Sequence, residues 1–250
     1  MDRLIVTGRG TTELAWMASA ALRDAPAITA DQLIPAGCRA VVVAPHPDDE
    51  VLAVGGLMAQ LARIGRPLCV VAVTDGTASH PGSPHWTPAR LGAERPREQA
   101  QALVSLGWSG LQMRRLGLPD GGLQAAQAEI AKALADVVEA RDVLITPWRL
   151  DGHPDHEAVG HACAAIAAQR GARLIEVPVW GWNWARPDEP RWPWGRARRL
   201  SLDAETASRK QAAVQAFGSQ IEADGSTGAP AVLDAQTLAR ARRPFELLFV

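Results

Sequence analysis

Two short segments of this sequence combine histidine and aspartate at spacings that suit a metal ion. The first is HPDDE at residues 46–50 and the second is HPDH at residues 153–156. Two imidazoles and a carboxylate form a common ligand set for a divalent transition metal, and catalytic zinc keeps a further position for water. His46 and Asp49 can meet from one turn because they stand at i and i+3, and His156 would arrive from the second segment. The pattern predicts a metal centre of His46, Asp49 and His156.

The same segments hold further acid–base groups. Asp48 is free to take a proton from a metal-bound water, whose pKa falls towards neutrality. His153 is free to act as a cation or acid near a developing oxyanion and a leaving amine. Asp155 is suited to hydrogen-bond either His153 or a ligand imidazole and so fix its tautomer. Together these roles describe hydrolysis that begins with a metal-activated water.

Each segment also has a purely structural interpretation. At the start of a helix, Asp48 and Asp49 would accept backbone N–H bonds as capping residues, and Asp155 would do the same in the second segment. His153 and His156 would then be surface residues. The combination favours chemistry, because both segments bring histidine and aspartate to the same place in the predicted fold.

That fold follows from the order of the elements. After residue 38, short apolar or β-branched runs alternate with patterns of helical period. The predicted strands are 39–45, 67–76, 111–121, 141–148 and 172–182, and the predicted helices between them are 50–65, 95–108, 122–140 and 154–171. Runs such as VVVA lack alternation, which is typical of strands covered on both faces. We therefore predict an α/β fold with a Rossmann-like, mostly parallel sheet and helices on both faces.

Chemistry-bearing segments follow four of these strands. They are residues 46–50, 74–76, 118–121 and 151–156. Ligands of open parallel sheets bind beyond the carboxyl ends of the strands, and these ends share one edge. We expect the four segments to converge there.

The remaining regions complete the predicted organisation. Residues 1–38 are expected to form a helical extension, capped at Thr11 or Thr12, that packs on the core or on a second subunit in a homo-oligomer. Residues 39–250 form a single domain. Within it, 76–96 is a long loop with little secondary structure, 196–203 is a strand, 204–220 is a helix and the final FELLFV is a strand.

Composition excludes several classes of protein. The chain has 250 residues, 47% of them hydrophobic and 21% charged, with a net charge of −1, as expected of a soluble globular protein. Two small arginine clusters are more typical of a solvated face than of a nucleic-acid site. No apolar run approaches the roughly 18 residues of a transmembrane helix, and the N-terminus lacks the order of a signal peptide, so a cytoplasmic location is expected. The three cysteines do not predict a disulfide framework.

At its two histidine segments the sequence resembles the PIG-L/LmbE-like deacetylases, which include the GlcNAc-phosphatidylinositol de-N-acetylases. The matching stretches are VVVAPHPDDEVLAVGG (41–56) and GHPDHEAVG (152–160), with weaker matches at TDG (74–76), LPDG (118–121) and SQ (219–220). The resemblance implies removal of an acetyl group from a small amino-sugar substrate.

The resemblance also implies a role for each residue. His46, Asp49 and His156 would bind zinc, with ferrous iron as the alternative. Asp48 would be the general base, His153 would stabilise the oxyanion and protonate the amine, and Asp155 would orient His153. Arg95 and Asp120 fall where relatives contact the sugar.

The sequence departs from the family at one position. The mycothiol-pathway members carry a tyrosine two residues before the second motif, where this chain has Asp151, and the chain contains no tyrosine. A mycothiol-type substrate is therefore disfavoured.

Five tryptophans between 180 and 194 suit either a sugar-recognising lid or a packed loop.

Two other functions fit parts of the pattern. A nucleotide-binding or regulatory α/β module would suit the fold, but no GxGxxG or GxxxxGK[ST] fingerprint follows the first strand. An Fe(II) oxygenase would share the two-histidine, one-carboxylate ligand set. It would leave the α/β order, Asp48 and His153 unexplained.

Overall fold

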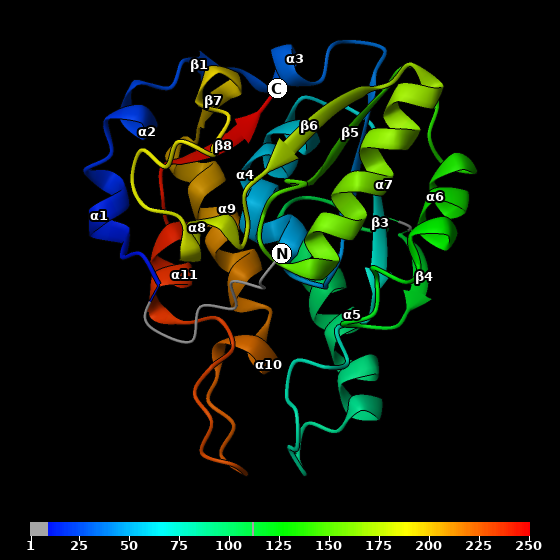
Figure 1. Ribbon diagram of the computed structural model, residues 1–250, viewed down its shortest axis with the longest axis vertical. Coiled ribbons are helices and arrows are strands. Elements are labelled where there is room, and N and C mark those ends of the chain that lie inside the picture. Colours follow the sequence, from blue (N-terminus) through cyan, green and yellow to red (C-terminus); the bar gives the residue numbers. More distant parts are fainter. Residues whose placement is uncertain (1–9, 112) are drawn as a thin grey trace.

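The predicted parallel strands are present in the computed structural model, which describes residues 10–111 and 113–250 (Figure 1). Residues 1–9 of the predicted extension, and residue 112 of the predicted run 111–121, lie outside the described part. The strands are β1 (Ala27–Ile28), β2 (Arg39–Ala44), β3 (Leu68–Thr74), β4 (Arg114–Leu118), β5 (Asp142–Pro147), β6 (Arg173–Val177), β7 (Ala197–Ser201) and β8 (Phe245–Phe249).

Helices cover both faces of this sheet. They are α1 (Glu13–Met17), α2 (Ala20–Asp24), α3 (Ala30–Leu33), α4 (Asp49–Arg63), α5 (Pro88–Ser105), α6 (Gln127–Ala135), α7 (Pro154–Arg170), α8 (Gly181–Trp184), the 3₁₀ turn η1 (Trp194–Arg196), α9 (Ala204–Gln215), α10 (Gly218–Ile221) and α11 (Ala235–Ala241).

The described strands form one sheet in the order β1-β7-β8-β6-β5-β2-β3-β4. The run from β6 to β4 is parallel, whereas β8 is antiparallel to both β6 and β7. This confirms the predicted Rossmann-like, mostly parallel α/β sheet. The chain moves outwards from β2 to β3 and β4, then returns to place β5 on the other side of β2. The strand order therefore reverses between β2 and β5, which is where ligands bind in folds of this type.

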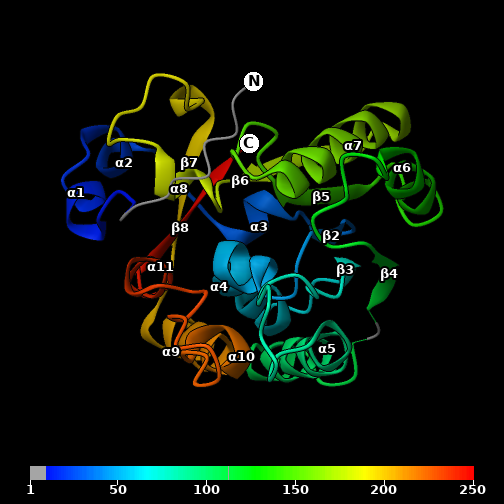
Figure 2. The same ribbon diagram turned by 60° about the horizontal axis from the view of Figure 1, so that its bottom comes forward.

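Alternate side chains of the buried strands point to opposite faces of the sheet and belong to two hydrophobic cores, one on each face. Val42 points to the face covered by α4, α5 and α9, whereas Val41 and Val43 point to the face covered by α6 and α7 (Figure 2). All three valines are at most 2% exposed. Burial on both faces explains the lack of alternation in the sequence of β2.

Several element boundaries differ from the prediction. The loop predicted over 76–96 is too long, because α5 already begins at Pro88, where the Thr87 side chain accepts a hydrogen bond from the Arg90 N–H. Thr-Pro is a frequent start of a helix, since proline at the first position has no N–H to leave unpaired. The predicted helix 204–220 is two helices, α9 and α10. The short elements β1, α3 and α11 were not predicted.

The described part of the N-terminal segment forms three short helices, α1, α2 and α3, in place of the single predicted one. Thr12 caps α1 and Ser19 caps α2, each through its side-chain oxygen. Trp16 and Leu22 are buried against the rest of the chain, whereas Leu14 is 83% exposed. The following β1 pairs with β7 and so belongs to the main sheet. The division at residue 38 and a homo-oligomer stay predictions.

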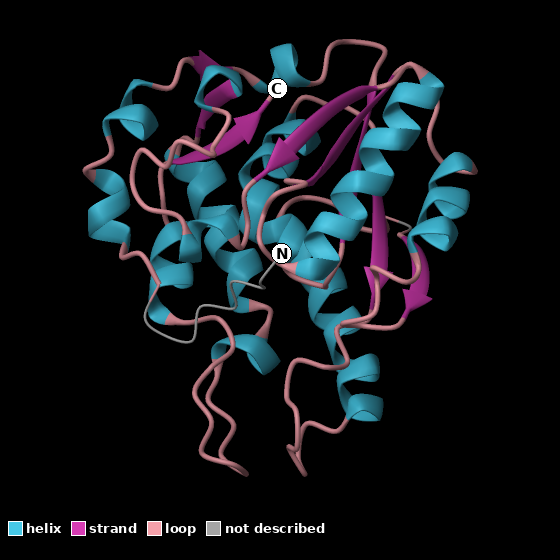
Figure 3. Cartoon of the chain, in the orientation of Figure 1, coloured by secondary structure: helices cyan, strands magenta, loops and turns pink. Residues whose placement is uncertain are grey.

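Two loops project from the same end of the molecule, one between β3 and α5 and one between α10 and α11 (Figure 3). A hydrogen bond of 3.3 Å between the Ser83 and Ser226 hydroxyls joins them.

None of the described helices is long and apolar enough to cross a membrane. Cys38, Cys69 and Cys163 are free thiols, in agreement with the predicted absence of a disulfide framework.

A buried ion pair joins α9 to β8 and α4. The Lys210 ammonium lies 2.7 Å from Glu246, whose carboxylate also accepts two backbone N–H bonds from α4. We expect Lys210→Met to lower the free energy of unfolding by about 3–5 kcal/mol, because Glu246 would remain buried without its cation. Urea denaturation measures this. The control is Arg209→Met, which breaks an exposed pair with Glu205 and should cost less than about 1 kcal/mol. Equal losses would contradict the prediction.

Candidate active site

The two histidine segments meet at the point where the strand order reverses. HPDDE follows β2 and HPDH follows the turn after β5, and these strands are neighbours in the sheet. The two segments also begin helices α4 and α7, so both helix N-termini approach the same place. The predicted convergence at the sheet edge is therefore present for these segments.

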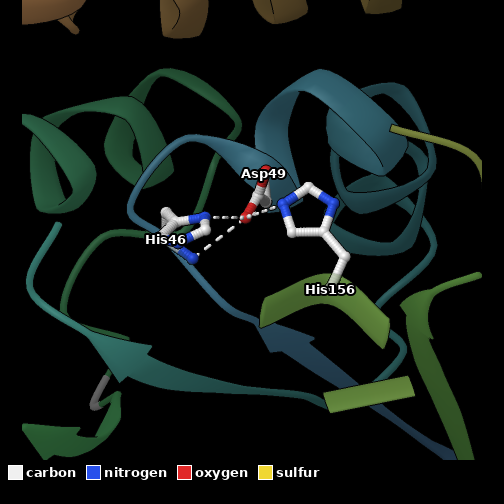
Figure 4. Close-up of side chains that lie close together, drawn as sticks. All are labelled: His46, Asp49 and His156. Atoms are coloured by element: carbon white, nitrogen blue, oxygen red, sulfur yellow. Dashed lines mark hydrogen bonds and ion pairs between the residues drawn. The ribbon is translucent and has the colours of Figure 1, made fainter. Parts of the chain in front are cut away.

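Asp49 stands between the two predicted ligand imidazoles (Figure 4). Its Oδ2 atom lies 3.1 Å from His46 Nδ1 and 3.4 Å from His156 Nε2. One ligand atom from each of the three residues lies within 4.8 Å of the others. A tetrahedral zinc with bonds of about 2.0–2.2 Å holds its ligand atoms roughly 3.3 Å apart. The three side chains therefore fit a divalent metal ion.

A second set of three overlaps with the first and consists of His46, His153 and Asp155. It is less suited to a metal because both oxygens of Asp155 are already engaged. They accept hydrogen bonds from the N–H groups of Gly121 (2.8 Å) and Leu123 (3.1 Å). We therefore assign Asp155 to the support of the site.

Carboxylates stand behind both ligand imidazoles. His46 Nε2 lies 3.2 Å from Asp120 and 3.3 Å from Asp155, and His156 Nδ1 lies 2.7 Å from Asp151. Such contacts fix the orientation of a ligand imidazole and increase its basicity. The structure thus supplies outer partners for both histidines.

The Asp155 carboxylate does not orient His153, contrary to the expectation from the family resemblance. It faces His46 and the backbone after β4 instead. Contact with His153 is made by the Asp155 backbone, whose N–H donates to His153 Nδ1 at 3.2 Å. The physical reason is local: His153 is the N-cap of α7, and its ring nitrogen caps the first turn. The alternative from residue chemistry, in which Asp155 supports a ligand imidazole, agrees with the geometry.

Asp151 has a larger role than the sequence indicated. It is fully buried, and besides His156 it accepts hydrogen bonds from three consecutive N–H groups, those of Val179, Trp180 and Gly181, at 2.7–2.9 Å. One carboxylate thus ties the His156 ring to the loop after β6. Sequence reasoning noted this position only as the replacement of a tyrosine. The signal that could have identified it is an aspartate five residues before a predicted ligand.

Asp48 is not a helix cap of the ordinary kind. It occupies the N-cap position of α4, but its side chain makes no capping hydrogen bond, and its φ of 141° is rare for a residue with a side chain. Backbone strain of this kind costs about 1–3 kcal/mol and concentrates at functional sites. The capping interpretation of Asp48 is therefore wrong. In this strained turn the Asp48 carboxylate accepts a hydrogen bond from Arg95, and Asp48 lines the same cavity as the three predicted ligands.

Arg95 holds Asp48 in place. Its buried guanidinium donates to Asp48 at 3.1 Å and to the carbonyl oxygens of Pro47 and Gly76 at 2.8 and 2.9 Å. Gly76 adopts a positive φ of 66°, and a Cβ atom there would overlap the guanidinium, so the TDG turn needs glycine. Arg95 and Asp120 both line the cavity, but their contact with a sugar stays a prediction.

The surroundings shift the pKa values of the two adjacent aspartates in opposite directions. Burial raises the pKa of Asp48 to about 6, against the opposing effect of Arg95. Burial acts in the same direction on Asp49, but the charges and hydrogen bonds of His156 and His46 outweigh it and hold its pKa well below the ordinary value. Asp49 is thus a permanent anion, as a metal ligand must be, whereas Asp48 can take up a proton near neutral pH.

The surroundings of His46 and His156 stabilise the protonated, positively charged forms of these two imidazoles. Burial alone would lower the pKa of His46, but hydrogen bonds to Asp120, Asp155 and Asp49 raise it well above the ordinary value. The pKa of His156 rises to about 9 against burial, mainly through Asp49 and Asp151. His153 is the exception, since burial and the charge of His156 lower its pKa to about 3. A divalent cation would satisfy the same carboxylates.

A cavity of about 220 Å³ opens onto the cluster. One wall, on the side of β3, β4 and α5, is polar and includes Ser79, Arg95 and Asp120. The other lining residues come from α4, from the segment 179–183 and from the segment 220–237, and they mix polar with apolar side chains. The polar ones include Asn183, Gln220 and Thr237, and the apolar ones are Leu52, Val179, Trp180, Val232 and Leu233.

Gln220 is a further candidate that sequence reasoning did not assign. It is buried and lines the cavity, and its Oε1 atom has no hydrogen-bond partner among the described residues. An unpaired carbonyl oxygen in a pocket is suited to accept a hydrogen bond from a ligand. The SQ match had marked the position without indicating a role.

Comparison with protein families gives one match that spans half of the chain. Residues 41–167 match the model of PIG-L, described as GlcNAc-PI de-N-acetylase. The matched range contains both histidine segments and the strands β2–β5 that position them. It therefore covers the metal cluster and its outer partners.

The chain is also similar to individual proteins that are named as deacetylases. The chain is 30% identical over 162 residues to 1D-myo-inositol 2-acetamido-2-deoxy-alpha-D-glucopyranoside deacetylase of Saccharomonospora viridis, covering 54% of this chain and 60% of that protein. It is 28% identical over 153 residues to 2'-N-acetylparomamine deacetylase of Streptomyces fradiae, covering 53% of each. The matches thus span little more than half the length of these curated relatives. Among solved structures, the A40926 pseudoaglycone deacetylase Dbv21 has a TM-score of 0.59 and 25% identity, with 84% of this chain and 96% of that chain covered.

Asp151 offers a direct test of this arrangement. We expect Asp151→Asn to weaken zinc binding about 10–100-fold, because an uncharged amide raises the basicity of the His156 imidazole less than a carboxylate does and has only one accepting oxygen. Competition with a chromophoric chelator measures the affinity. The matched control is Asp142→Asn, a buried carboxylate at the far end of β5 paired with Arg39. Unchanged zinc affinity in Asp151→Asn would show that the contact with His156 has no part in metal binding.

Proposed function

The chain belongs to the PIG-L family of GlcNAc-PI de-N-acetylases, and from that premise we propose that it is a zinc-dependent N-deacetylase acting on an amino sugar or amino-sugar conjugate. The observation that carries the proposal is the strained Asp48. This buried carboxylate is held by Arg95 and lines the same cavity as His46, Asp49 and His156, which together fit a metal. A helix cap would need none of these features.

The proposed roles follow from the geometry. His46, Asp49 and His156 would hold the metal, which would supply a water of lowered pKa and polarise the amide carbonyl. Asp48 would act as the general base towards the attacking water, a task suited to a carboxyl group with a pKa of about 6. His153 lies beside both ligand imidazoles, with ring centroids 5.1 Å from His46 and 4.5 Å from His156. From there its Nε2–H would hydrogen-bond the developing oxyanion, because Nδ1 accepts the Asp155 N–H. With a pKa of about 3 the ring is neutral, so it would first have to take up a proton before passing one to the leaving amine.

The amino-sugar class of substrate rests on two kinds of support. The relatives are named for acetylated amino-sugar compounds. In this chain, the polar wall with Arg95 and Asp120 offers charged partners for sugar hydroxyls beside the cluster. The replacement of tyrosine by Asp151 still disfavours a mycothiol-type substrate. Ferrous iron as the native metal, a cytoplasmic location and homo-oligomerisation remain proposals.

Two variants separate metal binding from catalysis. Asp48→Asn should keep its metal but lose about 10²–10⁴-fold in turnover, because the general base is removed. His156→Ala should lose the metal itself. Metal analysis coupled to an amine-release assay over a panel of N-acetylated amino sugars measures both. Asp75→Asn is the control, since this carboxylate after β3 pairs with Arg115 and does not line the cavity. Full turnover in Asp48→Asn would remove Asp48 from its role.

Metal removal distinguishes the alternatives. A chelator should abolish amine release, and added Zn²⁺ or Fe²⁺ should restore it both in air and without oxygen. Turnover that requires O₂ and 2-oxoglutarate would instead indicate the Fe(II) oxygenase. Nucleotide binding by protein without metal would favour the regulatory module.

A further inference from the structure

The five tryptophans between 180 and 194 have different surroundings in the structure. Trp182 and Trp192 are buried with Trp16 in a separate hydrophobic cluster, with ring centroids 4.7–4.9 Å apart. The indole N–H groups of Trp182, Trp184 and Trp194 donate to the carbonyl oxygens of Pro178, Asp151 and Glu189. Packing therefore accounts for four of the five.

Trp180 is the exception within this fully described segment. It is half-buried, and of the five tryptophans it alone lines the cavity that opens onto the metal cluster. Its ring meets that of His153 edge to face, with centroids 5.9 Å apart and an interplanar angle of 77°. Its indole N–H has no hydrogen-bond partner among the described residues. The side chain thus lies beside the reacting centre without a packing role of its own.

The backbone of Trp180 is fixed relative to the metal cluster. Its N–H donates to Asp151 Oδ2 at 2.7 Å, and the flanking N–H groups of Val179 and Gly181 donate to Asp151 Oδ1. Asp151 also bonds the His156 imidazole at 2.7 Å. One buried carboxylate therefore sets the position of the Trp180 backbone and that of a metal ligand together. A recognition group needs such support to act on a substrate held at the metal.

The cavity lining offers two kinds of surface to a ligand. Ser79, Arg95 and Asp120 bring polar groups to it, and Trp180 brings a large apolar, electron-rich ring. A pyranose ring has this character, because its hydroxyl groups lie around the edge and its C–H groups form apolar faces. An open-chain alditol keeps these hydroxyl groups and gains two more, at C1 and C5, but it has no flat apolar face.

We infer that Trp180 is the platform on which the pyranose ring of the substrate stacks, and that it selects cyclic amino sugars over open-chain ones. The inference rests on the proposed deacetylase function and narrows its substrate class. Trp180 is a specificity-determining residue that takes no part in proton transfer.

A matched pair of ligands tests the platform. Methyl N-acetylglucosaminide keeps the ring, whereas N-acetylglucosaminitol has the ring opened and reduced. Calorimetry on zinc-loaded Asp48→Asn protein measures their binding without turnover. We expect the glycoside to bind about tenfold more tightly than the alditol, a difference that one stacked aromatic contact can supply. Adding Trp180→Leu should abolish this preference, and adding Trp180→Phe should keep most of it.

The control is Trp194→Leu, which removes an indole of the same tryptophan-rich segment 180–194 that does not line the cavity and should leave the preference unchanged. Equal binding of the two ligands, or no binding of either, by the Asp48→Asn protein would overturn the inference. A preference that survives in Trp180→Leu, or that is lost in Trp180→Phe with intact zinc content, would do so as well. Failure of the proposed function is seen separately, as no amine release by the unaltered protein from any acetylated amino sugar.

Discussion

The site depends on the neutralisation of buried negative charge. Five aspartate carboxylates, at positions 48, 49, 120, 151 and 155, gather beyond the carboxyl ends of β2, β4 and β5, and four of them are at most 6% exposed. Burying so many carboxylates is costly unless cations or N–H donors face them. Arg95, two imidazoles and backbone N–H groups supply part of the compensation. The requirement for positive charge between these groups is the physical reason why the cluster suits a divalent cation.

Two adjacent aspartates take different roles because of their backbone geometry. Asp49 begins α4 and points between the imidazoles, whereas Asp48 adopts a strained conformation that turns its side chain to Arg95. Environments that move the pKa values of neighbouring carboxyl groups apart are a recognised way to obtain a permanent anion and a proton acceptor. Here a single turn after a parallel strand places two carboxyl groups in such different environments.

The tryptophan-rich region supports the site indirectly. The cluster around Trp16, Trp182 and Trp192 joins the N-terminal segment to the loop after β6 and forms a small core apart from those on the sheet faces. Because that loop is anchored at both this cluster and Asp151, its one cavity-facing tryptophan is held at a defined place. The N-terminal segment thus contributes to the cavity wall through packing, although none of its described residues lines the cavity.

The sequence by itself determined the Rossmann-like architecture and the residues that could bind a metal. Period and β-branching are local properties, and the rule that ligands bind beyond the carboxyl ends of parallel strands predicts that His46, Asp49 and His156 lie together. Tertiary structure alone decided the partners of these residues. Asp155 faces His46 and not His153, Arg95 holds Asp48, and Asp151 joins His156 to Trp180. Such contacts depend on the direction of each side chain and on loops that meet at the edge of the sheet. Neither of these can be predicted from the spacing of residues along the chain.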